Sequence, residues 1–185
     1  SPLTPFLVLA VDAKIRAHLN MLGVFGTPKI LVNDLSPNPD LDRKFKLEWV
    51  DKETIYRESD VISLHVPLTR STKNMITKKQ LEMMKSDAII INTSRGGVVN
   101  ELDLYNVMKT GHLSGAAIDV FEQEPYDGPL IEIERCFLTA HMGSMSLDCR
   151  TRMETEATEE VVRFIKKIPL KREVPEEEYI VQRGG

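Results

Sequence analysis

The chain has few cysteines, no basic cluster and no long apolar run, and each absence excludes a class of protein. Its 185 residues include two cysteines, Cys136 and Cys149, too few for a disulfide framework, so we expect a reducing, cytoplasmic location. The formal net charge is −4, without the basic patch typical of nucleic-acid binding. No apolar run approaches the roughly 18 residues of a membrane span. The apolar segment near residue 6 has no basic region before it, which argues against a signal peptide.

Strand-like and helix-like segments alternate along the chain. Segments with apolar residues at helical spacing predict helices over 14–23, 51–57, 77–84, 101–110 and 146–167. Short apolar segments predict strands over Phe6–Val11, Lys29–Asn33, Lys46–Val50, Val61–Val66, Ala88–Asn92, Gly115–Asp119 and Cys136–Ala140. Alternation with nearly continuous apolar strands is typical of a parallel sheet covered on both faces, so we predict a doubly wound α/β fold.

Three predicted strands lead to side chains that can carry acid–base chemistry. The fifth, sixth and seventh strands are followed by Arg95, Glu124 and His141. Because the carboxyl ends of parallel strands face one crevice, we expect these side chains to meet there. The guanidinium of Arg95 suits the carboxylate and keto oxygens of a 2-oxo acid, and Gly96 and Gly97 beside it let the backbone approach a ligand closely. An imidazole exchanges protons readily near neutral pH, which makes His141 the candidate acid–base.

The middle of the chain resembles the D-isomer-specific 2-hydroxyacid dehydrogenases. The motifs that carry the resemblance cover about half of the chain in the family's order. They are SDVISLHVPLTRSTKNMI at 59–76, MKSDAIIINTSRGGVVN at 84–100, and GAAIDVFEQEP at 115–125 followed by AHMGS at 140–144. The resemblance implies a Rossmann-like nucleotide-binding domain, NAD as cofactor, and hydride transfer between NAD and a D-2-hydroxy or 2-oxo acid. It also implies a homodimer, while the charge and the apolar runs described above predict no nucleic-acid or membrane partner.

By the same resemblance, Arg95, Glu124 and His141 form the catalytic set. Glu124 would orient the imidazole and stabilise its protonated form. Glu122 is the rival carboxylate, but the family's catalytic glutamate stands directly before a proline, here Pro125, which favours Glu124.

Three other histidines compete with His141. We expect His18 on a helix surface and His65 lining the cofactor cleft. His112 follows a helix C-terminus, where a cation is simply favourable.

Several residues are candidates for cofactor binding. Asp34 ends the second strand, about 20 residues beyond the first strand-to-helix turn. An acidic residue there meets the adenosine ribose hydroxyls and selects NAD over NADP. The resemblance adds His65, Pro67, Thr93 and Asp119, of which Thr93 and Asp119 would line the nicotinamide side.

Glycine is missing from the segment where the family has its phosphate-binding G-x-G-x-x-G. Val11, Ala13 and Arg16 occupy the three glycine positions. A β-carbon at Ala13, the residue that would face the diphosphate, intrudes on the phosphate, and Asp12 adds negative charge there. Three explanations stay open: weakened or lost cofactor binding, a different strand-to-helix register, or a local alteration of the stated sequence.

We expect three parts: a dinucleotide-binding domain at 1–145, a crossover helix at 146–168 and a charged C-terminal tail at 169–185. In the family a substrate domain surrounds the nucleotide domain, and here only Ser1–Pro5 precede the first strand. We therefore expect a fragment that lacks most of the substrate domain. The apolar face of the crossover helix is then exposed or covers a partner.

Two other functions compete with the dehydrogenase interpretation. A non-catalytic, corepressor-like binding module on the same fold fits the missing glycines, although the retained Arg95, Glu124 and His141 oppose it. A methyltransferase-like Rossmann domain tolerates loss of the second and third glycines, but it gives no reason for the TSRGG segment or for Glu124 and His141.

Overall fold

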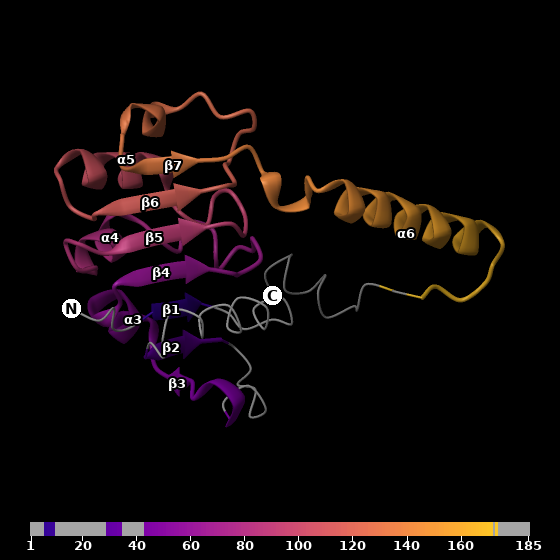
Figure 1. The fold of residues 1–185 in the computed structure, drawn as a ribbon, viewed down its shortest axis with the longest axis horizontal. Helices are drawn as coiled ribbons and strands as arrows, with labels where there is room; N and C mark the ends of the chain where they lie inside the picture. Colours follow the sequence, from indigo (N-terminus) through magenta and orange to yellow (C-terminus); the bar gives the residue numbers. More distant parts are fainter. Residues whose placement is uncertain (1–5, 10–28, 35–42, 172, 174–185) are drawn as a thin grey trace.

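A parallel sheet forms the centre of the molecule in the computed structural model, which describes residues 6–9, 29–34, 43–171 and 173 (Figure 1). Its strands are β1 (Phe6–Leu9), β2 (Ile30–Asn33), β3 (Glu48–Trp49), β4 (Val61–Leu64), β5 (Ile89–Asn92), β6 (Gly115–Ile118) and β7 (Cys136–Leu138). Their order across the sheet is β3-β2-β1-β4-β5-β6-β7, and every neighbouring pair is parallel. The direction of winding reverses between β1 and β4, as in doubly wound nucleotide-binding sheets. The α/β prediction is therefore confirmed.

In the described part of the chain, helices follow the strands from β3 onwards. They are α3 (Lys52–Glu58), α4 (Lys78–Met83), α5 (Glu101–Lys109), η2 (Pro129–Glu132), η3 (Met142–Ser144) and α6 (Leu147–Ile165). Polar residues define the helix starts: the side chains of Asp51, Asn100 and Ser146 each accept a backbone N–H from the first turn. At α4 the backbone N–H of Thr77 donates to Gln80 Oε1, which is half of a capping box. Both 3-10 helices are absent from the sequence-based prediction.

The hydrophobic core packs against one face of the central strands. Ile62, Leu64 and Ile90 are fully buried on β4 and β5, and Leu104 of α5 and Leu81 of α4 are fully buried with them. The opposite face of these strands is less buried, since Ile91 is half-buried and Ile89 keeps 37% of its surface exposed. The outermost strand β7 is different, since Phe137 keeps 70% of its surface exposed.

The strands β3, β4, β6 and β7 each end earlier than their apolar patterns predict, most clearly β4 and β7. β4 stops at Leu64, which pairs with Asn92, and β7 stops at Leu138, which pairs with Ile118. Backbone hydrogen bonding continues just past the end of β7, since the Thr139 N–H donates to the Ile118 carbonyl at 3.0 Å. The predicted helix at 14–23, with Ala13 and His18 in or beside it, lies outside the described residues.

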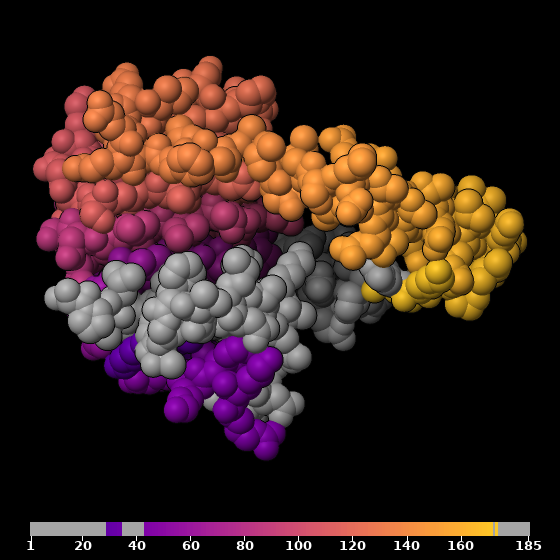
Figure 2. Space-filling model, in the orientation of Figure 1, coloured from indigo at the N-terminus to yellow at the C-terminus, as the bar shows by residue number. Residues whose placement is uncertain are grey.

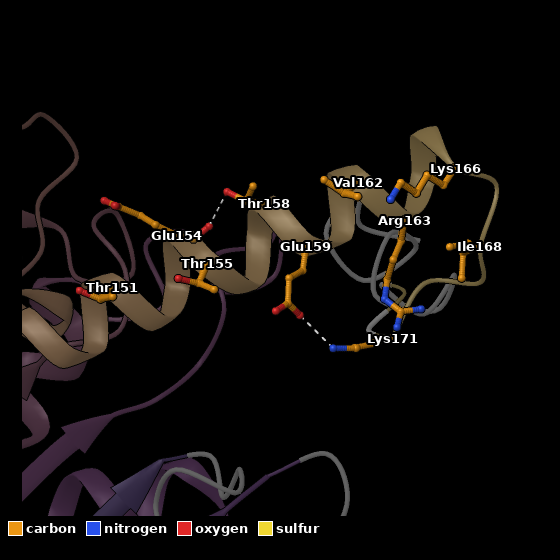
Figure 3. Close-up of a pocket in the computed structure, with 10 residues that line it drawn as sticks. All are labelled: Thr151, Glu154, Thr155, Thr158, Glu159, Val162, Arg163, Lys166, Ile168 and Lys171. Carbon is orange, nitrogen blue, oxygen red and sulfur yellow. Dashed lines mark hydrogen bonds and ion pairs between the residues drawn. The ribbon is translucent and has the colours of Figure 1, made fainter.

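Helix α6 extends away from the sheet (Figures 1 and 2). None of its side chains is buried, and Leu147, Phe164 and Ile165 are among its most exposed apolar residues. A hollow of about 650 Å³ runs along it, where Glu159 forms an ion pair with Lys171 at 2.9 Å (Figure 3). All residues of this hollow come from 151–171, so it is separate from the strand ends. No helix in the described part of the chain combines the length and apolar character needed to cross a bilayer.

Cys136 packs within β7, and burial raises the pKa of its thiol to about 11. The reactive form of cysteine is the thiolate, so we expect iodoacetamide at pH 8 to modify Cys136 at least about tenfold more slowly than a cysteine in an unstructured peptide. Peptide mass spectrometry over a time course measures this rate. In denaturant the rate should rise to that of the peptide. If Cys136 in the folded chain reacted as fast as the cysteine in the unstructured peptide, the packing role would be contradicted.

Candidate functional site

Arg95 is presented by a tight turn that follows β5. The buried amide of Asn92 organises the turn: its Nδ2 donates to the Arg95 carbonyl at 3.0 Å, and its Oδ1 accepts from the backbone N–H and the hydroxyl of Ser94. The Arg95 side chain is exposed, and its Nη1 donates to the Ser94 carbonyl at 2.6 Å. Asn92 therefore fixes the backbone while the guanidinium stays accessible to an anion.

The glycines after Arg95 join two loops of the site. A β-carbon on Gly96 would lie 1.9 Å from the carbonyl oxygen of Phe121, and Gly97 has a φ of +77°. The sequence analysis expects a ligand to approach the backbone at Gly96. In the structure, the backbone of the loop that follows β6 occupies that space instead. This contact places the Arg95 turn directly against the segment that carries Glu124.

Glu124 and His141 form a hydrogen-bonded pair. His141 Nδ1 lies 3.0 Å from Glu124 Oε2, and Glu124 Oε1 accepts the backbone N–H of Phe121 at 3.1 Å. The Phe121 N–H and then the His141 side chain lower the pKa of Glu124 below its ordinary value. Glu124 is therefore a carboxylate at neutral pH, and protonation disrupts the pair only when the pH falls through this lowered pKa.

His141 sits in a left-handed backbone conformation that Asp119 holds in place. Its φ and ψ are 53° and 52°, and its N–H donates to the Asp119 carbonyl at 2.8 Å. The Asp119 carboxylate accepts the Met142 N–H at 2.8 Å and the Thr139 hydroxyl at 2.5 Å. Asp119 is 8% exposed and fastens the chain on both sides of the histidine. The sequence assigned Asp119 to cofactor binding and missed this structural role.

Arg95, Glu124 and His141 line one hollow of about 720 Å³ at the carboxyl ends of β5, β6 and β7. Lys73 and Glu122 lie on the same wall. Glu124 and His141 also line a second, more apolar hollow of about 580 Å³. The arrangement thus combines a cation for an anionic ligand with an imidazole whose partner carboxylate is already in place.

The rival residues have other contacts. Glu122 Oε1 is 3.9 Å from Lys73 Nζ. His65 Nε2 is 2.8 Å from the Ser63 hydroxyl, and His112 Nε2 is 3.0 Å from the Leu81 carbonyl. His112 therefore connects its loop to α4.

The candidate cofactor residues follow β2, β4, β5 and β6, whose carboxyl ends lie at one edge of the sheet. Asp34 comes directly after β2 and is half-buried, and His65 comes directly after β4. Pro67 and Thr93 are exposed beyond β4 and β5, and Asp119 follows β6. Ala13, the remaining candidate, lies outside the described residues.

Comparison with known protein families matches residues 16–143 to the family described as D-isomer specific 2-hydroxyacid dehydrogenase, NAD binding domain. Among curated proteins, a glyoxylate reductase of Korarchaeum cryptofilum is 43% identical over 138 residues, which cover 74% of this chain and 42% of that protein. A hydroxypyruvate reductase of Thermotoga maritima is 38% identical over 144 residues, 74% of this chain and 45% of that protein. The chain thus spans less than half the length of these curated relatives.

Solved structures of similar fold cover nearly the whole chain. The apo form of Rhodotorula graminis D-mandelate dehydrogenase superposes with a TM-score of 0.84 at 27% identity, covering 94% of this chain and 52% of that one. The D-lactate dehydrogenase of Lactobacillus jensenii with NAD⁺ gives a TM-score of 0.80 at 25% identity, covering 93% and 56%.

Proposed function

The chain belongs to the D-isomer specific 2-hydroxyacid dehydrogenase family, and on that premise we propose that it serves an enzyme that transfers a hydride between NAD and a D-2-hydroxy acid or its 2-oxo acid. One observation carries the proposal: Arg95 lines the same hollow as the hydrogen-bonded Glu124–His141 pair. The names of its relatives, glyoxylate reductase and hydroxypyruvate reductase, favour small 2-oxo acids as substrates.

In this proposal Arg95 binds the substrate. Its planar guanidinium pairs with the carboxylate and the C2 oxygen, and this pairing polarises the keto group. Asn92 fixes the backbone position of Arg95. A substrate carboxylate bound by Arg95 is therefore placed so that the C2 carbon is oriented relative to His141.

His141 moves the proton and Glu124 supports it. With Nδ1 directed at Glu124 Oε2, the Nε2 atom is the one that faces the substrate oxygen. In reduction of a 2-oxo acid, the imidazolium donates its Nε2 proton to the C2 oxygen, and in oxidation the neutral imidazole accepts it. The negative Glu124 carboxylate stabilises the imidazolium.

The residues present fit NAD. The strand order reverses between β1 and β4, and the crevice at such a switch point accommodates dinucleotides. Asp34 would hold the adenosine ribose hydroxyls, and His65, Pro67, Thr93 and Asp119 would line the rest of the cleft. When bound, NAD accepts the hydride from C2 in oxidation, and NADH supplies it in reduction.

The domain division stays part of the proposal: a dinucleotide-binding domain at 1–145, a crossover helix at 146–168 and a charged tail at 169–185. The exposed side chains of Leu147, Phe164 and Ile165 support a homodimer in which such apolar surface is covered. The free thiols of Cys136 and Cys149 support a reducing, cytoplasmic location.

We expect the chain to bind NADH saturably at micromolar concentration, as measured by calorimetry, and to prefer it to NADPH. Asp34→Ala should reduce that preference by at least about tenfold, because a charge pair a few ångströms apart near a protein surface exceeds the ~1.4 kcal/mol that a factor of ten requires. Asp87→Ala removes an exposed carboxylate just before β5, at the opposite edge of the sheet, and should leave the preference unchanged. Absence of NADH binding at millimolar concentration would favour the binding-module alternative.

A further inference from the structure

The first turn of α5 carries two carboxylates that each hold a distant piece of backbone. Glu101 Oε1 accepts the N–H of Glu122 at 2.7 Å. Asp103 Oδ2 accepts the N–H of Lys78 at 2.9 Å. The two bonds are chemically alike, but only the first reaches the loop that carries Glu124.

The loop after β6 is fastened at several points close together. The backbone of Phe121 lies against Gly96, and its N–H donates to Glu124 Oε1. The N–H of the next residue, Glu122, donates to Glu101, which is the first residue of α5 and follows the Arg95 loop. Glu101 therefore attaches the loop of Glu124 to the helix that begins directly after the Arg95 loop.

The surroundings of Glu101 favour its role as a hydrogen-bond acceptor. The side chain is half-buried, and burial raises its pKa, an effect that the Glu122 N–H partly offsets and the Glu122 carboxylate adds to. Burial penalises the charged form of a carboxyl group but leaves its capacity to accept a hydrogen bond. The oxygen of a neutral side-chain amide at the same distance can also accept the Glu122 N–H, so this bond depends first on the length of the side chain.

We propose that Glu101 is a positioning residue: it holds the backbone of Glu122 so that Glu124 stays within hydrogen-bond distance of His141. The consequence for catalysis rests on the function proposed above, whereas the geometric claim can be tested without turnover.

Two substitutions separate reach from charge. Glu101→Asp keeps the charge but shortens the side chain by one methylene group, and Glu101→Gln keeps the reach but removes the charge. We expect Glu101→Asp to speed hydrogen exchange at the Glu122 amide by at least about tenfold and Glu101→Gln to leave it near its original rate. Asp103→Ala is the matched control, which should speed exchange at Lys78 and not at Glu122. Unchanged exchange at Glu122 in Glu101→Asp would overturn the proposal.

The second measurement follows the Glu124 carboxyl group by ¹³C NMR during a pH titration. Glu101→Asp should move the pKa of Glu124 upward towards its ordinary value, because the Phe121 and His141 bonds that lower it loosen together. Glu101→Gln and Asp103→Ala should titrate like the original chain. The positioning role is wrong if Glu101→Asp leaves the Glu124 titration unchanged. It is also wrong if Glu101→Gln raises the pKa of Glu124 as much as Glu101→Asp does. A failure to bind NADH would instead remove the proposed function and leave these results standing.

Discussion

Under the proposed function, replacing His141 with glutamine is expected to lower the turnover of a small 2-oxo acid such as glyoxylate by about 10²- to 10⁴-fold, the usual range for loss of a general acid–base. Glutamine retains hydrogen-bonding capacity at similar volume but cannot exchange a proton. The measurement is the decrease in NADH absorbance at saturating glyoxylate and NADH. Because Arg95 is unchanged, we expect the KM for glyoxylate to change less than kcat.

His112→Gln is the matched control for this substitution. His112 binds the Leu81 carbonyl, away from the hollow that contains Arg95 and His141, so its replacement should leave kcat within about twofold when the protein is folded. Turnover of His141→Gln equal to that of the unsubstituted enzyme would remove His141 from the mechanism. Equal losses in both variants would indicate a general effect on folding.

The fold could be predicted from the sequence because its strongest signal, a short apolar strand segment, recurs along the chain. Strands such as Val61–Leu64 and Ile89–Asn92 are apolar at nearly every position, and Ile62, Leu64 and Ile90 are fully buried. Once the strands are parallel, their carboxyl ends must share an edge, which is why Arg95 and His141 could be expected in one hollow. Strand ends were harder to predict, because a ladder stops where its neighbour stops and not where the apolar run does.

The contacts between the loops of the site could not be predicted from the sequence in the same way. Gly96 was predicted to approach a ligand, but whether a glycine faces a ligand or another loop depends on distant backbone. Glu101 and Asp103 look alike in the sequence, as acidic residues in a first helical turn, where the helix dipole alone favours them. Only the positions of Glu122 and Lys78 distinguish them.

Gly96→Ala is expected to destabilise the fold by about 1–3 kcal/mol, the range for inserting a group where there is no space. The new β-carbon would meet the carbonyl oxygen of Phe121 at 1.9 Å, its carbonyl carbon at 2.0 Å and the nitrogen of Glu122 at 2.6 Å. All three atoms belong to backbone, so no side-chain rotation can relieve the overlap and one loop must move. The midpoint of urea unfolding, followed by circular dichroism, measures the effect.

Gly115→Ala provides the comparison, because its β-carbon would meet the Arg135 carbonyl oxygen at 3.4 Å, an ordinary contact distance. We expect its unfolding free energy to stay within about 0.5 kcal/mol of the original. Loop movement in Gly96→Ala should also raise the pKa of Glu124, since the Phe121 N–H that lowers it belongs to the displaced segment. Similar unfolding midpoints for the two variants would mean that the Arg95 turn and the Glu124 loop are not in contact in solution. The shared hollow would then lose the contact that holds its two walls together.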